Sequence, residues 1–86
     1  MLTLDQFKEA RGVLRGVISD TELVHSPYIS DLCGNEVYLK PENLQVTGAY
    51  KIRGAYYKTS LLSEEQKARG LITASAGNHA QGVAYA

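Results

Sequence analysis

The sequence predicts an open α/β fold, in which helices flank a parallel sheet that is incomplete in this chain. Apolar residues recur at three- and four-residue spacings in residues 4–14 and 48–62, which is typical of amphipathic helices. Two short β-prone runs, residues 36–40 and 71–74, alternate with helical segments in the order strand, helix, helix, strand, turn, helix. In such sheets, ligands bind at the carboxyl ends of the strands.

The first element is a predicted helix over residues 4–14. Thr3 or Asp5 stands near its start as the expected N-cap, because both residue types accept hydrogen bonds from the first free N–H groups of a helix. Residues 16–34 contain a proline and show no sustained period. They predict an arm or loop with at most a short helix around residues 28–32.

The run Glu36–Lys40 is β-prone and lies between Asn35 and Pro41, which predicts a short strand. The alternation of strands and helices begins with this strand. We therefore divide the chain into a predicted N-terminal helix and arm, residues 1–35, and the start of an α/β domain, residues 36–86.

Two helices are predicted after this strand. The first covers residues 48–62, and the second begins at Ser63, where Gln66 three residues later completes a capping-box pattern. Gly70 is expected to close the second helix. One face of the first helix carries Ala49, Ile52, Ala55, Tyr56 and Thr59.

Leu71–Ala74 is a short, apolar and partly β-branched run, which predicts a strand buried in a parallel sheet. Ser75–His79 then makes a turn into a last predicted helix, residues 80–86. No glycine, proline or polar cap follows Ala86. We therefore expect the chain to be the truncated start of a longer protein.

Composition narrows the classes of partner. Nine Lys and Arg residues balance nine Asp and Glu residues, so no net field attracts nucleic acid or an anionic membrane. The single cysteine, Cys33, cannot form an internal disulfide, and the first residues lack the features of a signal peptide. No stretch is long and apolar enough to span a membrane. These features predict a cytoplasmic protein that acts on a small molecule.

Lys51 is a candidate for covalent chemistry. It stands at the start of a predicted helix, three residues after Gly48 and two before Arg53. Only a neutral amine attacks an aldehyde, and both Arg53 and the positive end of the helix dipole are expected to favour the neutral amine. The alternative is an ordinary solvated helix lysine, which is the commoner role of a lysine taken alone.

The turn Ser75–His79 is a candidate anion site. It follows a predicted strand and opens a helix, so the backbone N–H groups of Gly77, Asn78 and His79 could converge on a carboxylate or phosphate. The alternative is an ordinary strand-to-helix turn with Asn78 as its cap. Neither His79 nor His25 has a cysteine or carboxylate at metal-ligand spacing, so each is expected to lie at the surface or in a hydrogen bond.

Two segments together, Leu39–Ala55 (LKPENLQVTGAYKIRGA) and Ser75–Gly82 (SAGNHAQG), resemble the serine/threonine dehydratase family of fold-type-II pyridoxal-phosphate enzymes. The resemblance covers about the whole chain, because residues 1–35 also look like the N-terminal extension of the family. It implies the tryptophan-synthase-β-like fold and pyridoxal 5'-phosphate as the cofactor. In this reading, residues 36–86 begin the cofactor-binding catalytic domain, whose remainder is absent.

The resemblance implies a role for each matching residue. Lys51 would bind the cofactor covalently and later take the proton from the substrate Cα. Asn78 would hydrogen-bond the ring hydroxyl oxygen of the cofactor. The loop that grips the substrate carboxylate would consist of Ser75, Gly77, Asn78 and His79. In members that respond to a nucleotide, the effector site would fall near Val46, Thr47 and Gln81.

The implied reaction is dehydration of L-threonine to 2-oxobutanoate and ammonia, in isoleucine biosynthesis or threonine catabolism. Ala76 departs from the serine racemase relatives, which carry a second serine there as the base for the opposite face, so dehydration is favoured over racemisation. The alternatives are a dehydratase for serine or another β-hydroxy amino acid, and a non-catalytic binding module. Family members usually form dimers or tetramers, and these 86 residues alone are expected to be inactive.

Overall fold

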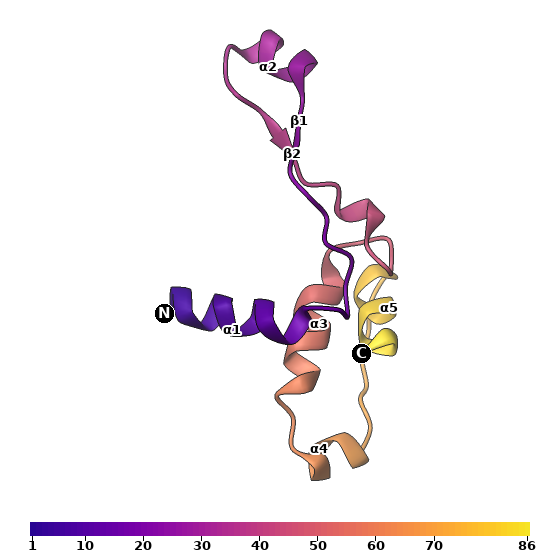
Figure 1. The fold of residues 1–86 in the computed structure, drawn as a ribbon. Coiled ribbons are helices and arrows are strands. Elements are labelled where there is room, and N and C mark those ends of the chain that lie inside the picture. Colours follow the sequence, from indigo (N-terminus) through magenta and orange to yellow (C-terminus); the bar gives the residue numbers. More distant parts are fainter.

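The computed structural model describes residues 1–86, which form an elongated arrangement with extents of 53 × 31 × 25 Å (Figure 1). Helices dominate, and the strands are short. In chain order the elements are α1 (Leu4–Leu14), β1 (Val24–His25), α2 (Pro27–Cys33), β2 (Tyr38–Leu39), the 3-10 helix η1 (Glu42–Leu44), α3 (Lys51–Ser60), α4 (Glu64–Ala68) and α5 (Asn78–Tyr85). None of these helices has both the length and the apolar character that crossing a bilayer requires.

Helix α1 begins where the sequence predicted, with Thr3 as its N-cap. The Thr3 hydroxyl accepts a hydrogen bond from the Gln6 backbone N–H at 3.3 Å, and the Gln6 side chain accepts one from the Thr3 backbone N–H at 2.8 Å. This reciprocal pair is a capping box, and it decides between the two expected caps in favour of Thr3.

A hairpin protrudes from the rest of the molecule, with α2 at its tip (Figure 1). Strand β1 pairs antiparallel with β2, so that Val24 lies opposite Leu39 and His25 opposite Tyr38. The short helix predicted around residues 28–32 is therefore confirmed as α2. The strand predicted over residues 36–40 is shorter than expected, and its partner β1 was not predicted.

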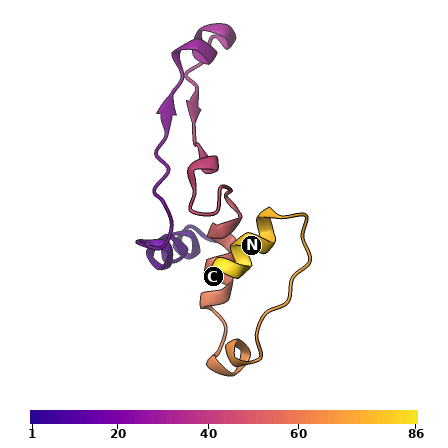
Figure 2. The ribbon, with the colours of Figure 1, turned by 90° about the vertical axis from the view of Figure 1, so that its right-hand side faces the viewer.

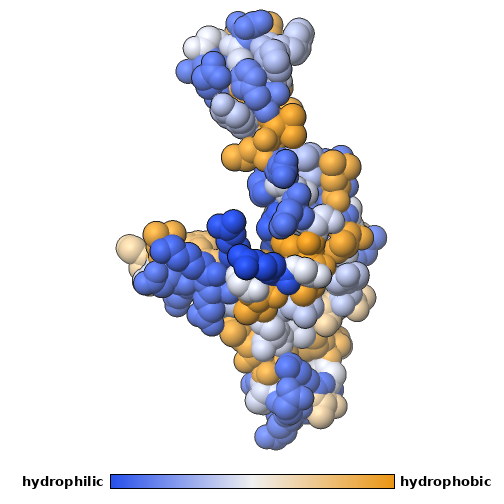
Figure 3. All heavy atoms as spheres, in the orientation of Figure 1, coloured by the Kyte–Doolittle hydropathy of each residue, from blue (hydrophilic) through white to orange (hydrophobic).

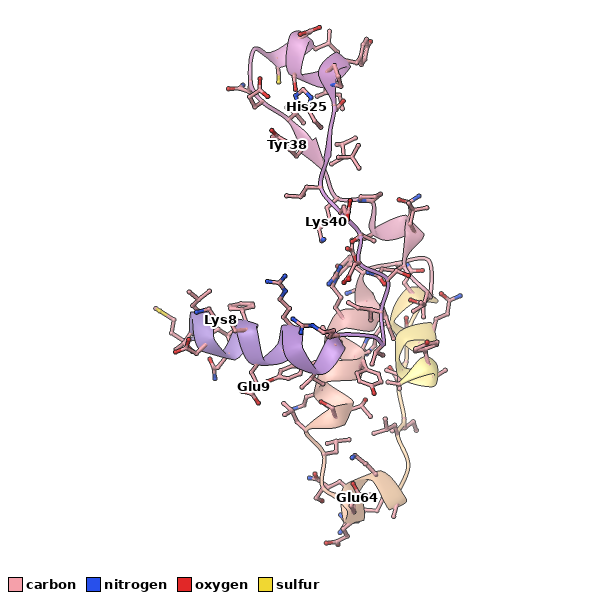
Figure 4. The ribbon with its side chains drawn as sticks, in the orientation of Figure 1. Lys8, Glu9, His25, Tyr38, Lys40 and Glu64 are labelled. Atoms are coloured by element: carbon pink, nitrogen blue, oxygen red, sulfur yellow. The ribbon has the colours of Figure 1, made fainter.

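Ser30 holds the hairpin closed below its tip. Its buried hydroxyl accepts a hydrogen bond from the Val37 backbone N–H at 2.9 Å and lies 3.3 Å from Nε2 of His25. The same nitrogen lies 3.1 Å from a Glu36 carboxylate oxygen, and the His25 and Tyr38 rings contact each other in a tilted arrangement with centroids 5.2 Å apart (Figure 4). His25 is thus a hydrogen-bonded histidine, as the sequence predicted.

The strand predicted at residues 71–74 does not form in this structure. These residues run as an extended segment between α4 and α5 (Figure 2), and the Ile72 side chain is 99% exposed. A strand needs a neighbour for its backbone hydrogen bonds, and β1 and β2 use each other. The sheet within this chain is therefore a two-stranded antiparallel pair, and the parallel sheet of the predicted fold is not assembled from these residues.

The small core lies where α1 and α5 pack on α3. Only eight residues of 86 are buried, and the apolar ones are Leu14, Ala49, Ile52 and Ala55. Three of these lie on the predicted apolar face of residues 48–62. Many large apolar side chains remain exposed, and Figure 3 shows them over β1, β2 and around α3. Exposed apolar area of this extent is typical of surfaces that other protein segments cover.

Helix α4 confirms a purely local prediction. The Ser63 hydroxyl accepts a hydrogen bond from the Gln66 backbone N–H at 3.2 Å, while the Gln66 side chain accepts one from the Ser63 backbone N–H at 2.9 Å. Gly70 follows the helix with φ +78°, a conformation that glycine adopts without strain. The helix therefore begins and ends as its sequence predicts.

Candidate active site

Lys51 is the first residue of α3, and the turn before it sets the direction of the helix. The Gly48 backbone N–H donates to the Gln45 carbonyl oxygen at 2.8 Å, and Gly48 has φ +73°, in the left-handed region that favours glycine. Tyr50 precedes the helix, and the Lys51 Nζ atom lies 5.1 Å from the centroid of its ring. The Lys51 side chain is exposed, so its amine is accessible to a ligand.

The predicted anion loop leads into α5. The Ser75 hydroxyl accepts a hydrogen bond from the Gly77 backbone N–H at 3.1 Å. Gly77 is the N-cap of α5 and offers no side-chain cap, which overturns the alternative that Asn78 caps this helix. The first helical hydrogen bond runs from the Gln81 N–H to the Gly77 carbonyl oxygen at 3.0 Å. The N–H groups at the start of the helix therefore have no partner within it.

The exposed side chains at this end belong to Asn78 and His79, the first two residues of α5. His79 is a surface histidine, as expected. A helix N-terminus with free N–H groups attracts anions, because the helix dipole and the N–H groups act in the same direction. The loop therefore has the polar groups that a carboxylate needs.

Gly82 brings the two sequence motifs together. This buried residue of α5 packs against the start of α3, and a Cβ atom added to it would lie 3.3 Å from both the carbonyl carbon and the carbonyl oxygen of Lys51. The same Cβ would lie 3.2 Å from the Ala55 Cβ. Only a residue without a side chain permits this approach without displacement. As a result, the backbone of the candidate lysine lies beside the middle of α5.

Arg53 is held by the carboxylate of Glu42. Its Nε atom donates to Glu42 Oε2 at 2.9 Å and its Nη2 atom donates to Glu42 Oε1 at 2.8 Å, which is a bidentate ion pair. The Arg53 hydrogen bonds lower the pKa of Glu42 to about 2, and the Glu42 carboxylate raises the pKa of Arg53. The Arg53 charge is therefore neutralised by Glu42, and this ion pair holds η1 to α3.

Gln45 and Thr21 connect the segment before α3 with the N-terminal arm, and the sequence did not predict either contact. Gln45 Oε1 accepts a hydrogen bond from the Ser19 N–H at 3.2 Å, and Gln45 Nε2 donates to the Ser19 carbonyl oxygen at 2.8 Å. Thr21 receives a hydrogen bond from Arg53 Nη2 at 3.1 Å and donates to Glu42. Lys40 Nζ donates to the Thr21 carbonyl oxygen, where the hairpin meets the rest of the molecule (Figure 4). No sequence pattern marks contacts over such separations.

The residues proposed for a nucleotide effector are not joined by any hydrogen bond. Val46 is exposed, Thr47 is half-buried with its hydroxyl donating to the Ala49 carbonyl oxygen at 3.4 Å, and Gln81 is exposed on α5. The effector site therefore stays a prediction.

A hollow in the surface lies away from these residues. A groove of about 980 Å³ runs between α1 and α3, and Figure 3 shows the hydrophilic surface beside it. Neither Lys51 nor any residue of the Ser75–His79 turn lines it. These candidate residues belong to α3 and to the turn into α5, and they lie outside the groove.

Comparison with known proteins identifies the family. The family model described as "Pyridoxal-phosphate dependent enzyme" matches residues 14–86. The chain belongs to this family. Its relatives include an L-threonine ammonia-lyase of Thermotoga maritima, which is 56% identical over the whole chain and of which the chain covers 21%. They also include "L-threonine dehydratase biosynthetic IlvA" of Lactococcus lactis, which is 46% identical over the whole chain, again with 21% of that protein covered.

A solved structure shows the same fold. Serine racemase of Dictyostelium discoideum superposes with a TM-score of 0.90 at 40% identity, over 98% of this chain and 27% of that one. The fold-type-II class is therefore confirmed. The chain spans about a fifth of the length of the curated relatives it matches, so it corresponds to their N-terminal part.

The residues present fit part of a pyridoxal-phosphate site. The cofactor of this family carries an aldehyde, and Lys51 supplies an accessible primary amine at the start of α3. The polar Asn78 side chain and the free N–H groups of α5 lie on the helix that packs against Lys51. An amine and hydrogen-bond donors on adjacent helices are the donor set that binding the cofactor and an amino-acid carboxylate requires.

Proposed function

We propose that this chain is the N-terminal part of a threonine ammonia-lyase that uses pyridoxal 5'-phosphate to convert L-threonine to 2-oxobutanoate and ammonia. One observation carries the proposal: Gly82 packs against the Lys51 backbone, so the helix that begins at Asn78 lies against the helix that presents the accessible Lys51 amine. The two relatives named for threonine deamination, at 56% and 46% identity, support this substrate.

Lys51 is the proposed catalytic residue. Its amine would hold the cofactor covalently and would accept the proton from the substrate Cα. When bound, the cofactor supplies an electron sink that makes this proton removable. Lys51 is exposed at the start of α3, so its side chain would be able to change position without disturbing the buried residues of this helix.

The turn before α5 is the proposed substrate grip. Ser75, Gly77, Asn78 and His79 would hold the carboxylate through backbone N–H groups and polar side chains, with Ser75 already fixing the Gly77 N–H. Asn78 would also hydrogen-bond the ring hydroxyl oxygen of the cofactor. Loss of the β-hydroxyl as water and hydrolysis of the resulting enamine then release ammonia and the oxo acid.

Several finer assignments belong to the same proposal. Residues 1–35 would be the N-terminal helix and arm, and residues 36–86 the start of the catalytic domain. The name of the Lactococcus lactis relative favours a role in isoleucine biosynthesis. The proposed location is the cytoplasm, and the exposed apolar area favours burial against the rest of the polypeptide and against further subunits.

A second candidate function is serine racemisation, which the likeness to a serine racemase structure favours. Racemisation needs a base on each face of the substrate, and this chain has Ala76 at the position where the racemases carry a serine. The two readings are separated by incubating the complete enzyme with L-serine. Dehydration yields pyruvate and ammonia, whereas racemisation yields D-serine.

The test of the proposed function uses the complete enzyme that contains this chain. Wild type, Lys51→Ala and the matched control Lys58→Ala, which removes an exposed lysine from the other end of the same helix, are each mixed with pyridoxal phosphate and L-threonine. We expect wild type and Lys58→Ala to show the visible absorbance of covalently bound cofactor and to form 2-oxobutanoate, and Lys51→Ala to do neither. A cofactor band that survives Lys51→Ala would make Lys51 an ordinary solvated lysine and favour a non-catalytic binding module.

A further inference from the structure

Two side chains near Lys51 are both anchored to the same piece of the N-terminal arm. Gln45, six residues before Lys51, hydrogen-bonds the Ser19 backbone, and Arg53, two residues after it, hydrogen-bonds the Thr21 hydroxyl. We propose that the arm segment 19–21 is a positioning device for Lys51, with Gln45 and Thr21 as its positioning residues. The proposal rests on the proposed function in that Lys51 is taken as the reacting amine.

The Gln45 side-chain amide pairs with the backbone of the arm in the way that a neighbouring strand would. Its amide uses a donor and an acceptor on the N–H and carbonyl oxygen of one residue, Ser19, at 3.2 and 2.8 Å, and the side chain is 5% exposed. A buried amide with both its oxygen and its nitrogen hydrogen-bonded resists displacement, because breaking this contact leaves two backbone groups and one amide without partners. The Gln45 carbonyl oxygen in turn holds the Gly48 N–H at 2.8 Å. The arm is thereby connected to the turn that precedes α3.

The second anchor fixes the first turn of α3. Arg53 forms the bidentate ion pair with Glu42 and donates to Thr21, whose hydroxyl donates to the same carboxylate. Thr21 is 6% exposed, and the Glu42 side chain is 19% exposed, so solvent screens this group less than a surface pair. The arm, η1 and α3 therefore meet at a single hydrogen-bonded cluster.

The segment between the anchors would otherwise have freedom to move. Residues 46–50 contain no side-chain hydrogen bond except that of the Thr47 hydroxyl, and Gly48 lies in the left-handed region, where glycine imposes no preference of its own. Displacement of a reacting group by about 1 Å can cost on the order of a hundredfold in rate. By fixing both ends of this segment, the arm therefore affects the position of Lys51 and, through its position, the rate at which it reacts.

The opposing interpretation is that the cluster only stabilises the fold. The two interpretations differ in what changes locally: a positioning role requires faster opening of the turn before Lys51 while the rest of the enzyme stays folded. Hydrogen exchange of the cofactor-free enzyme measures this opening, and it requires neither bound cofactor nor turnover.

The experiment compares Gln45→Leu and Thr21→Val, which keep the approximate side-chain volume and remove the hydrogen bonds, with two controls in the complete enzyme. Thr21→Ser retains the hydroxyl, and Thr59→Val removes a hydroxyl of α3 that takes no part in the cluster. Each test variant loses two hydrogen bonds, so we expect both to speed amide exchange in residues 46–52 by about tenfold or more. We also expect kcat to fall about tenfold while KM for L-threonine changes less than about twofold. Thr21→Ser and Thr59→Val should match wild type.

Unchanged exchange in residues 46–52 in both folded test variants overturns the proposal, as does an equal loss of kcat in Thr21→Ser and Thr21→Val. If Gln45→Leu fails to fold, the comparison of Thr21→Ser with Thr21→Val decides whether the proposal stands. Wild-type enzyme that does not deaminate L-threonine would refute the proposed function, and the exchange rates would still decide whether the arm restrains the turn before Lys51.

Discussion

The Gly82 backbone lies close to the Lys51 carbonyl group: a Cβ at residue 82 would lie 3.3 Å from the Lys51 carbonyl oxygen, which is tighter than most contacts of a Cβ atom. This approach couples two helices that lie far apart in the sequence. It makes the position of the candidate lysine depend on the size of a residue in α5.

We predict that Gly82→Val separates α3 from α5. Its side chain would push on the Lys51 backbone and the Ala55 Cβ, and such overpacking lowers the free energy of unfolding by about 1–3 kcal/mol. We expect weaker cofactor binding as well, because Lys51 moves. Denaturant titration and cofactor titration measure the two effects.

The control is Gly54→Ala in α3, because a Cβ there would have no neighbour within 4 Å. It should raise the free energy of unfolding by up to about 1 kcal/mol through the higher helix propensity of alanine. Equal behaviour of the two glycine variants would show that the Gly82 contact does not restrain Lys51.

The Glu42–Arg53 pair predicts a dependence of stability on pH. The pKa of Glu42 is lowered from 4.5 to about 2 in the folded protein, chiefly by the Arg53 hydrogen bonds. A lowered pKa means that the stabilisation is fully present above about pH 4.5 and is lost as the pH falls toward 2. We expect Glu42→Gln to cost about 2 kcal/mol at pH 7, an amount reduced by the partial exposure of the pair. The deficit should shrink as the pH is lowered through this window.

Denaturant midpoints of wild type and Glu42→Gln, measured between pH 7 and 3, provide the test. Glu36→Gln is the control, because Glu36 is exposed and contacts His25 on the hairpin, outside the Glu42 cluster. A difference between wild type and Glu42→Gln that is constant with pH would contradict the pairing of Glu42 with Arg53.

For Asn78 we predict an effect on the bound cofactor. Asn78→Ala removes the side chain proposed to hydrogen-bond the ring hydroxyl oxygen, so we expect a shifted visible absorbance spectrum and a kcat lower by about tenfold to a hundredfold. Spectra and steady-state kinetics of the complete enzyme measure both. Asn35→Ala, which removes a hydrogen bond to the Cys33 carbonyl oxygen on the hairpin, should leave the spectrum unchanged.

For Ser75 we predict an effect on substrate binding. The Ser75 hydroxyl fixes the Gly77 N–H at 3.1 Å, and Ser75→Ala frees this group and removes a polar side chain from the proposed carboxylate loop. We expect KM for L-threonine to rise about tenfold, the effect of losing one hydrogen bond. Ser60→Ala, at the end of α3, is the control and should change KM little. A wild-type KM in Ser75→Ala would exclude the loop as the carboxylate grip.

Local patterns in the sequence determined much of the secondary structure. The caps Thr3 and Ser63 each bond to a residue three positions later, and the apolar spacings that mark α1 and α3 are of three and four residues. Such features can be predicted because helix hydrogen bonds and capping involve near neighbours only. The lysine and the turn before α5 were likewise apparent as motifs. The resemblance of these motifs also identified the family that the comparisons later confirmed.

Only the tertiary structure decided how these parts meet. The pairing of Arg53 with Glu42, the anchoring of Gln45 to the arm and the packing of Gly82 on Lys51 join residues separated by many positions, and no local spacing encodes them. The strand predicted at residues 71–74 does not form, for the same reason. A strand is stabilised by hydrogen bonds to a neighbour, so its formation depends on what lies beside it and not on its own residues.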